Sequence, residues 1–180
     1  NHIRAVIMVP TRELAQQIDM QFEGFSYFLP ISTTVVYGGG DGAGWDQQKK
    51  GLLMGADVVI ATPGRLLSHI ANSGIDLSQV SYFILDEADR MLDMGFIHDI
   101  RRILPLLPAK RQTLFFSATM PDDIVKLANT MLRNPAHVTV TPPASVVETI
   151  RQSVLFAEKA EKRTLLASLL RERPESSVLV

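Results

Sequence analysis

The sequence predicts an α/β fold in which helices cover both faces of a parallel β-sheet. Short apolar runs rich in β-branched residues alternate along the chain with segments of helical periodicity, which is typical of doubly wound parallel sheets. Most of these runs lack polar alternation, as expected for strands buried on both faces. The predicted strands are Ala5–Val9, Thr33–Tyr37, Asp57–Ala61, Tyr82–Leu85, Thr113–Phe116 and Ala136–Val140.

Two helices are predicted from apolar residues spaced three or four positions apart. The first apolar stripe consists of Leu14, Ile18, Phe22, Phe25 and Leu29. The second helix begins after Pro121 with an acidic pair, a composition that suits a first helical turn. Its apolar stripe consists of Ile124, Leu127, Ala128 and Met131.

The chain is predicted to hold one domain and the start of another, at residues 1–140 and 150–180. Residues 141–149 include Pro142-Pro143, which continue neither helix nor strand, and are predicted to be a linker. The second domain is predicted to open with strand Ile150–Phe156, a helix around Glu161–Leu170 and a strand from Ser177. The apolar face of that helix is formed by Leu165, Leu166, Leu169 and Leu170. Because apolar strands lie close to both chain ends, we expect a fragment.

Composition excludes several classes of function. The 180 residues carry a net charge of −1, so nucleic-acid contacts are expected to use local groups rather than an overall positive field. The absence of cysteine excludes disulfides, thiolate metal sites and a cysteine nucleophile, and it fits a cytoplasmic protein. No apolar run approaches the roughly 18 residues of a membrane span, and no membrane partner is expected.

Carboxylates directly follow the apolar strand Tyr82–Leu85, in Asp86-Glu87-Ala88-Asp89. This is the Walker B arrangement. Asp86 can bind Mg²⁺, directly or through water, because hard cations prefer oxygen ligands. Glu87 can orient or deprotonate the attacking water in phosphoryl transfer. Taken alone, a solvated acidic turn explains the Asp-Glu pair equally well.

Three further polar motifs each follow a predicted strand: Pro10–Ala15, Thr62–Arg65 and Ser117–Thr119. They combine hydroxyls, arginines and the free N–H groups of helix starts, which bind phosphate without reading base sequence. Each motif alone is explained as a helix cap. Parallel strands place their carboxyl ends at one edge, so the motifs together with Asp86-Glu87 predict a shared ligand site.

Glycines follow the strand Thr33–Tyr37, and they allow a ligand to approach the backbone closely. The run Tyr37–Gly44 does not match G-x-G-x-x-G, so a dinucleotide site is not supported. A flexible loop near the nucleic-acid path is one interpretation, and a surface loop at Asp41–Gly44 is the other. Trp45 could stack on a base, although packing beneath the loop is favoured.

These motifs, in this order, resemble those of DEAD-box RNA helicases: Pro10–Ala15 is similar to motif Ia, Gly38-Gly39 to the GG motif, Thr62–Arg65 to motif Ib, Asp86–Asp89 to motif II and Ser117–Thr119 to motif III. The resemblance implies a RecA-like domain of the P-loop NTPase type, truncated at its N-terminus. It also implies that residues 150–180 begin the second RecA-like domain.

The resemblance further implies an ATP-dependent RNA helicase that uses ATP and Mg²⁺. Asp86, together with Glu87, would hold the Mg²⁺ of ATP, and Glu87 would also position the hydrolytic water. Asp89 would hydrogen-bond toward Ser117 and Thr119, which couple the nucleotide to RNA strand separation. The residues implied to lie along the RNA backbone, without base specificity, are Pro10, Thr11, Arg12, Gly38, Gly39, Thr62, Pro63, Gly64 and Arg65.

The sequence departs from the family in lacking any Gly-Lys dipeptide, and therefore a Walker A loop. The family's arginine finger, worth about 10³–10⁵-fold in rate, would lie beyond Val180. We therefore expect these 180 residues alone neither to hydrolyse ATP nor to unwind RNA. Two alternatives are a non-catalytic RNA-binding or scaffold module, and a DNA helicase of the same superfamily. The residues of the motifs follow the RNA-helicase pattern, which disfavours the DNA helicase.

Overall fold

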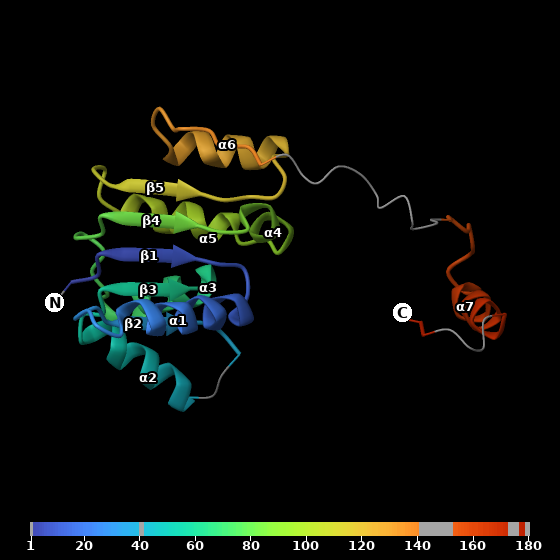
Figure 1. The fold of residues 1–180 in the computed structure, drawn as a ribbon, viewed down its shortest axis with the longest axis horizontal. Helices are drawn as coiled ribbons and strands as arrows, with labels where there is room; N and C mark the ends of the chain where they lie inside the picture. Colours follow the sequence, from blue (N-terminus) through green and yellow to red (C-terminus); the bar gives the residue numbers. More distant parts are fainter. Residues whose placement is uncertain (1, 40–41, 141–152, 173–176, 179–180) are drawn as a thin grey trace. The chain divides into compact units, whose positions relative to one another are not determined.

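The structure is a computed structural model that describes residues 2–39, 42–140, 153–172 and 177–178. The chain divides into two compact units, Asn1–Pro135 and Ala136–Val180. The first unit contains the sheet and six α-helices (Figure 1). Within the described ranges, none of the helices has the length and apolar character of a membrane-spanning segment.

The first unit is built on a five-stranded parallel sheet of order β2-β3-β1-β4-β5. The first residue of each strand pairs with the first residue of its neighbour, so the strands are in step and end together. The predicted parallel α/β sheet is confirmed, with strand ends shifted by one residue at most in these five strands. The strands are β1 (Ala5–Met8), β2 (Thr33–Val36), β3 (Val58–Ala61), β4 (Tyr82–Leu85) and β5 (Gln112–Phe115).

Helices lie on both faces of this sheet. One face includes Val6, Phe83 and Leu85 and packs in one core with residues of α3, α4, α5 and α6. The other face includes Ile7 and Ile60 and packs against α1. Because both faces are covered, successive strand residues are buried, which explains the apolar runs without alternation. The helices are α1 (Arg12–Ser26), α2 (Gly42–Leu53), α3 (Pro63–Ser73), α4 (Ala88–Asp93), α5 (Ile97–Ile103) and α6 (Asp122–Met131), and a 3₁₀ turn spans Leu104–Leu106.

The predicted apolar stripe of α1 is only partly buried. Leu14, Ile18 and Phe22 pack against the sheet. Phe25 is 71% exposed, and Leu29 is 54% exposed and lies beyond the end of the helix, so the prediction that the helical stripe extends to Leu29 is wrong. A 15-residue helix is about 22 Å long, whereas a four-residue strand spans about 13 Å. The end of α1 therefore extends beyond the strands.

The predicted stripe of α6 is confirmed, since all four of its apolar residues are buried. The prediction of a sixth strand at Ala136–Val140 is wrong, because residues 136–140 form no strand. Val138 and Val140 are exposed. An apolar run becomes a strand only where a neighbouring strand accepts its backbone hydrogen bonds, and no described strand pairs with this segment.

The second unit contains α7 (Lys162–Arg171), which confirms the helix predicted around Glu161–Leu170. The four leucines of its predicted apolar face are half-buried or exposed. Residues 153–156 and 177–178 form no strand. The rest of the strand predicted at Ile150–Phe156 and the linker predicted at 141–149 lie outside the described residues.

Candidate nucleotide and nucleic-acid site

The polar motifs that follow the five strands share one edge of the sheet. Just beyond the strands, the N–H groups of Val9, Thr62, Asp86 and Phe116 donate to carbonyl oxygens of the neighbouring strand at 2.8–3.0 Å. These bonds hold the junctions between strands and loops side by side. Along the edge, the glycine pair after β2 comes first, then the motifs after β3 and β1, the carboxylates after β4, and Ser117–Thr119 after β5. The sequence predicted that the motifs share one edge, and the structure adds their order along it.

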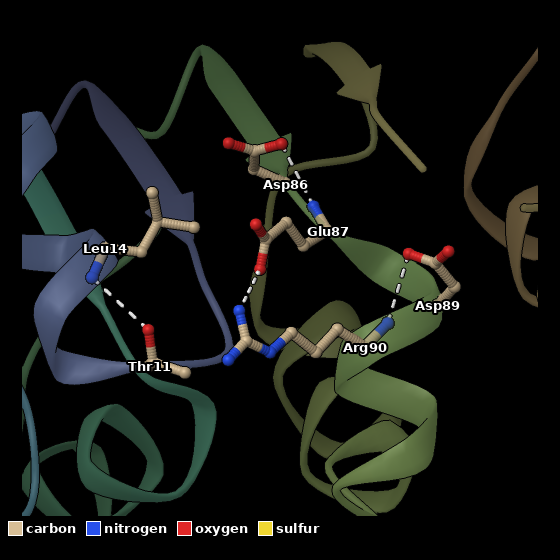
Figure 2. Close-up of polar contacts among 6 residues, drawn as sticks. All are labelled: Thr11, Leu14, Asp86, Glu87, Asp89 and Arg90. Atoms are coloured by element: carbon tan, nitrogen blue, oxygen red, sulfur yellow. Dashed lines mark hydrogen bonds and ion pairs between the residues drawn. The ribbon is translucent and has the colours of Figure 1, made fainter. Parts of the chain in front are cut away.

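Asp86 lies at the carboxyl end of β4 with its side chain half-buried. Its Oδ1 accepts the N–H of Glu87 at 3.0 Å (Figure 2). Burial raises the pKa of Asp86 above its usual value; the Glu87 N–H opposes this shift, and the negative charge of Glu87 adds to it. Oxygen donors whose negative charge is incompletely solvated favour a hard cation. The donor set therefore fits Mg²⁺.

Glu87 has a left-handed backbone, with φ 53° and ψ 50°, directly before α4. This conformation costs a non-glycine residue about 1–2 kcal/mol, and such strain is found preferentially at functional sites. Its Oε2 lies 3.1 Å from Nη1 of Arg90 (Figure 2). The strained turn and this ion pair orient the Glu87 carboxylate close to Asp86.

Asp89 joins the start of α4 to the segment after β5. Its Oδ2 accepts the N–H of Thr119 at 2.9 Å and the Thr119 hydroxyl at 2.7 Å. Its own N–H donates to Ser117 Oγ at 3.1 Å. Burial acts to raise the pKa of Asp89, but hydrogen bonds with Thr119 and Ser117 outweigh it, and the pKa lies below its usual value. The contacts that the resemblance implied for Asp89 are thus present.

Replacing Asp89 with alanine is expected to lower the free energy of unfolding by about 0.5–1.5 kcal/mol, because two donors of exposed Thr119 exchange a charged acceptor for water. Thr119→Val removes one of these bonds, so the double variant should cost less than the sum of the two single changes. Urea denaturation measures both values. Asp93→Ala, an exposed position on the same helix, is the control and should stay within about 0.5 kcal/mol. Additive effects would contradict the coupling.

The helix starts after β1 and β3 hold the predicted RNA residues. Thr11 caps α1, since its Oγ1 accepts the N–H of Leu14 at 3.2 Å (Figure 2). Pro10 before it is buried. Thr62 is buried before α3 and makes no side-chain cap bond, and Pro63 opens the helix. Thr11 is therefore a structural cap, while the Thr62 hydroxyl is not used in this way.

The glycines of the predicted site differ in whether the structure requires glycine at their positions. Gly39 has φ +87°, a conformation that side chains rarely adopt, whereas Gly38 faces open space. A Cβ on Gly64 would lie 3.3 Å from Oδ2 of Asp99, which is tighter than an ordinary contact. Only at Gly39, therefore, does the backbone conformation require glycine. The open space at Gly38 leaves room for a ligand to approach.

The two predicted RNA-contacting arginines both lie on aromatic rings of the segment that follows β2. Arg12 Cζ is 4.8 Å from the ring centroid of Tyr37. Arg65 Cζ is 5.2 Å from the ring centroid of Trp45. Arg12 also lines a cavity of about 550 Å³ between α1, β2 and α2. A larger cavity of about 1070 Å³ lies at the opposite ends of β4 and β5, and no predicted site residue lines it.

The loop predicted at Asp41–Gly44 is wrong for its last part, because α2 already begins at Gly42. Residues 40 and 41 lie outside the description. The first turn of a helix tolerates glycine, since its N–H groups have no partner within the helix. Leu52 anchors α2 in the core. The spacing of Trp45, Gln48 and Leu52 is the signal that could have indicated this helix.

His69 is a buried residue whose role the sequence did not indicate. Its ring stacks on Trp45, with centroids 3.8 Å apart and an interplanar angle of 17°. Gln48 Nε2 donates to the Tyr37 carbonyl, so Gln48 Oε1 is left to accept from His69 Nε2, at 3.2 Å. His69 Nδ1 has no partner among the described residues. The neutral imidazole therefore fits this position.

Burial, followed by the charges of Arg65 and Lys49, lowers the pKa of His69. The unfolded chain, with a pKa near 6.5, then binds the proton more readily than the folded chain. Stability should therefore fall as pH drops below about 6.5. Urea denaturation at pH 7.5 and about 5.5 measures this loss, which His69→Gln should reduce. Exposed His98→Gln is the control, and an unchanged pH dependence in His69→Gln would contradict the assignment.

The DEAD/DEAH box helicase family model matches residues 1–127. The chain is 37% identical over 180 residues to the ATP-dependent RNA helicase DbpA of Bacillus subtilis, covering 99% of this chain and 37% of that protein. It is 40% identical over 178 residues to the ATP-dependent RNA helicase DeaD of Mycobacterium tuberculosis, covering 98% and 31%. It is also 40% identical over 177 residues to the ATP-dependent rRNA helicase rrp3 of Schizosaccharomyces pombe, covering 98% and 37%.

The chain thus spans about a third of the length of these curated relatives. The matched region contains all five motifs, from Pro10 to Thr119, and the whole sheet. The resemblance drawn from those motifs is confirmed. This chain belongs to the DEAD/DEAH box helicase family.

Proposed function

We propose that this chain is part of an ATP-dependent RNA helicase, in which ATP binding and hydrolysis drive local separation of RNA strands. The observation that carries the proposal is the shared sheet edge. On it, Asp86 and Glu87 lie between the Ser117–Thr119 segment on one side and the starts of α1 and α3 on the other. Acidic groups suited to a metal nucleotide and helix starts suited to phosphates thus lie along one line.

The acidic end of this edge supports nucleotide hydrolysis. Asp86 would hold Mg²⁺, directly or through water, and Glu87 would contribute to the same site. Bound there, Mg²⁺ supplies charge neutralisation for the phosphates of ATP. Glu87 orients the attacking water and accepts its proton. The left-handed backbone of Glu87 determines the position of this carboxylate.

Asp89 supports coupling between the two ends of the site. Its hydrogen bonds to Thr119 tie the turn that carries Asp86 and Glu87 to the loop after β5. In this proposal, Asp89 is the residue through which a movement of this turn on nucleotide binding reaches Ser117 and Thr119. A shift of that loop is the step that we assign to strand separation.

The opposite end supports sequence-independent RNA binding. The starts of α1 and α3 present backbone N–H groups, the positive end of the helix dipole, and the side chains of Arg12 and Arg65. These groups recognise the phosphate backbone and carry no information about bases. The glycine pair Gly38-Gly39 leaves space for the RNA strand to approach the backbone. The cysteine-free chain fits a cytoplasmic site of action, which is part of the same proposal.

The experiment compares this chain with the full-length gene product. The 180 residues contain no Gly-Lys dipeptide, so we expect no phosphate release above background and no unwinding from them alone. The full-length protein should hydrolyse ATP faster with single-stranded RNA than without it. Phosphate release and displacement of a labelled RNA strand measure the two activities. Turnover by the 180-residue chain that depends on Glu87 would contradict the first expectation.

A non-catalytic RNA-binding or scaffold module is the alternative. The same comparison separates the two functions. A full-length protein that binds RNA but releases no phosphate with RNA present would support the alternative. RNA-stimulated hydrolysis that is lost in Glu87→Gln would support the helicase.

A further inference from the structure

Two aromatic side chains of one short segment each contact a different arginine. Tyr37 follows β2 and Trp45 lies in the first turns of α2, on either side of Gly38-Gly39. Arg12 lies over the Tyr37 ring and Arg65 over the Trp45 ring. Arg12 and Arg65 come from the first turns of α1 and α3, so one segment reaches both helix starts.

The two rings are themselves held by a chain of contacts. Gln16 Nε2 donates to the Tyr37 hydroxyl at 3.1 Å, and Gln48 Nε2 donates to the Tyr37 carbonyl at 3.1 Å. Gln48 also bonds to buried His69, on which Trp45 stacks. Tyr37 and Trp45 are therefore linked through the side chain of Gln48 and its partner His69.

The guanidinium groups of both arginines lie over aromatic faces. Among the residues that the structure describes, neither Arg12 nor Arg65 forms an ion pair. An aromatic face attracts a guanidinium but does not neutralise it, and it leaves the N–H groups at the edge of the guanidinium available. A carboxylate partner would occupy the same N–H groups that bind phosphate bidentately. The arrangement therefore suits a ligand with phosphate groups.

We propose that Tyr37 and Trp45 are positioning residues that hold Arg12 and Arg65 in place for the RNA backbone. This rests on the proposed function, and it assigns to the segment after β2 a part in RNA binding through arginine orientation. A flexible arginine loses side-chain entropy when it binds, whereas an arginine already held on a ring loses less. Removing either ring should thus weaken binding through the loss of arginine orientation.

The test measures binding of a fluorescein-labelled oligouridine to the full-length protein by anisotropy, at one salt concentration and with a non-hydrolysable ATP analogue. Trp45→Leu, which fills space without an aromatic face, should weaken binding about two- to fivefold. Trp45→Phe should stay within about twofold, because a ring remains. Tyr37→Leu and Tyr37→Phe make the same comparison for the ring that contacts Arg12, with the same expected effects on binding.

A double-variant cycle separates positioning from general destabilisation. In an Arg65→Ala background, Trp45→Leu should weaken RNA binding no further, because the residue that it positions is gone. A merely structural role would weaken binding in both backgrounds. Trp45 is the only tryptophan of the 180 residues, so its emission reports the contact directly in this chain. Arg65→Ala should shift that emission, and Arg12→Ala should leave it unchanged.

Wild-type binding by Trp45→Leu, together with weaker binding by Arg65→Ala, would overturn the inference, as would additive effects in the cycle. If the wild-type full-length protein fails to bind oligouridine, the proposed function fails, and the positioning of Arg65 for RNA fails with it. The emission comparison distinguishes this case, because it shows whether the contact between Arg65 and Trp45 exists without RNA.

Discussion

Replacing Glu87 with glutamine in the full-length protein is expected to lower RNA-stimulated ATP hydrolysis by about 10²–10⁴-fold, the usual contribution of a general base. Glutamine has nearly the same shape but cannot accept the proton of the attacking water. The left-handed backbone at this position is unchanged, because both side chains meet the same strain. The loss therefore reports the carboxylate charge and not the turn.

Phosphate release at saturating ATP and RNA measures this effect, and binding of a fluorescent ATP analogue shows that the site still forms. Asp93→Asn is the matched control, since Asp93 is an exposed carboxylate on the same helix. It should retain nearly all of the activity. If Glu87→Gln kept more than about a tenth of the wild-type rate, the assignment of the general base to Glu87 would be wrong.

Replacing Phe83 with alanine is expected to lower the free energy of unfolding by about 3–5 kcal/mol. Phe83 is 0% exposed and lies in β4, between β1 and β5, where its ring packs into the core that α3 to α6 cover. The change removes a large side chain from a site bounded by strands on both sides, which cannot close around the cavity. The turn with Asp86 and Glu87 follows directly, so its position should loosen as well.

Urea denaturation followed by circular dichroism measures this loss. Phe116→Ala is the control, because Phe116 follows the neighbouring strand but is 51% exposed, and it should cost less than about 1 kcal/mol. Phe83→Leu keeps most of the volume and should cost less than about 1.5–2 kcal/mol. Equal losses for Phe83→Ala and Phe116→Ala would show that β4 is not the centre of the core.

The sequence predicted the five strands of the sheet and the edge at which the polar motifs meet. Burial on both faces leaves a direct mark, an unbroken apolar run such as Val58–Ala61. Parallel pairing then places every strand end on one side, so Asp86 and Ser117 could be brought together without knowledge of the contacts. The hydrogen bonds between Asp89 and the Ser117–Thr119 segment followed from the resemblance.

Predictions from the local sequence pattern failed where an element depended on contacts with residues far away in the sequence. Ala136–Val140 has the composition of a strand, but no described strand pairs with it. Phe25 continues the spacing of α1, yet the strands are too short to cover it. Gly42 resembles a loop residue until the packing of Leu52 stabilises the helix that begins there.

The sequence by itself therefore determined the five strands of the sheet, their order along the chain and the chemistry at their ends, because these depend on neighbouring residues. Only the tertiary structure decided that His69 is buried against Trp45 and that Arg12 and Arg65 lie on aromatic rings. Such contacts join side chains that are far apart in the sequence. Their geometry arises from the packing of the helices on the sheet, which no periodicity along the chain encodes.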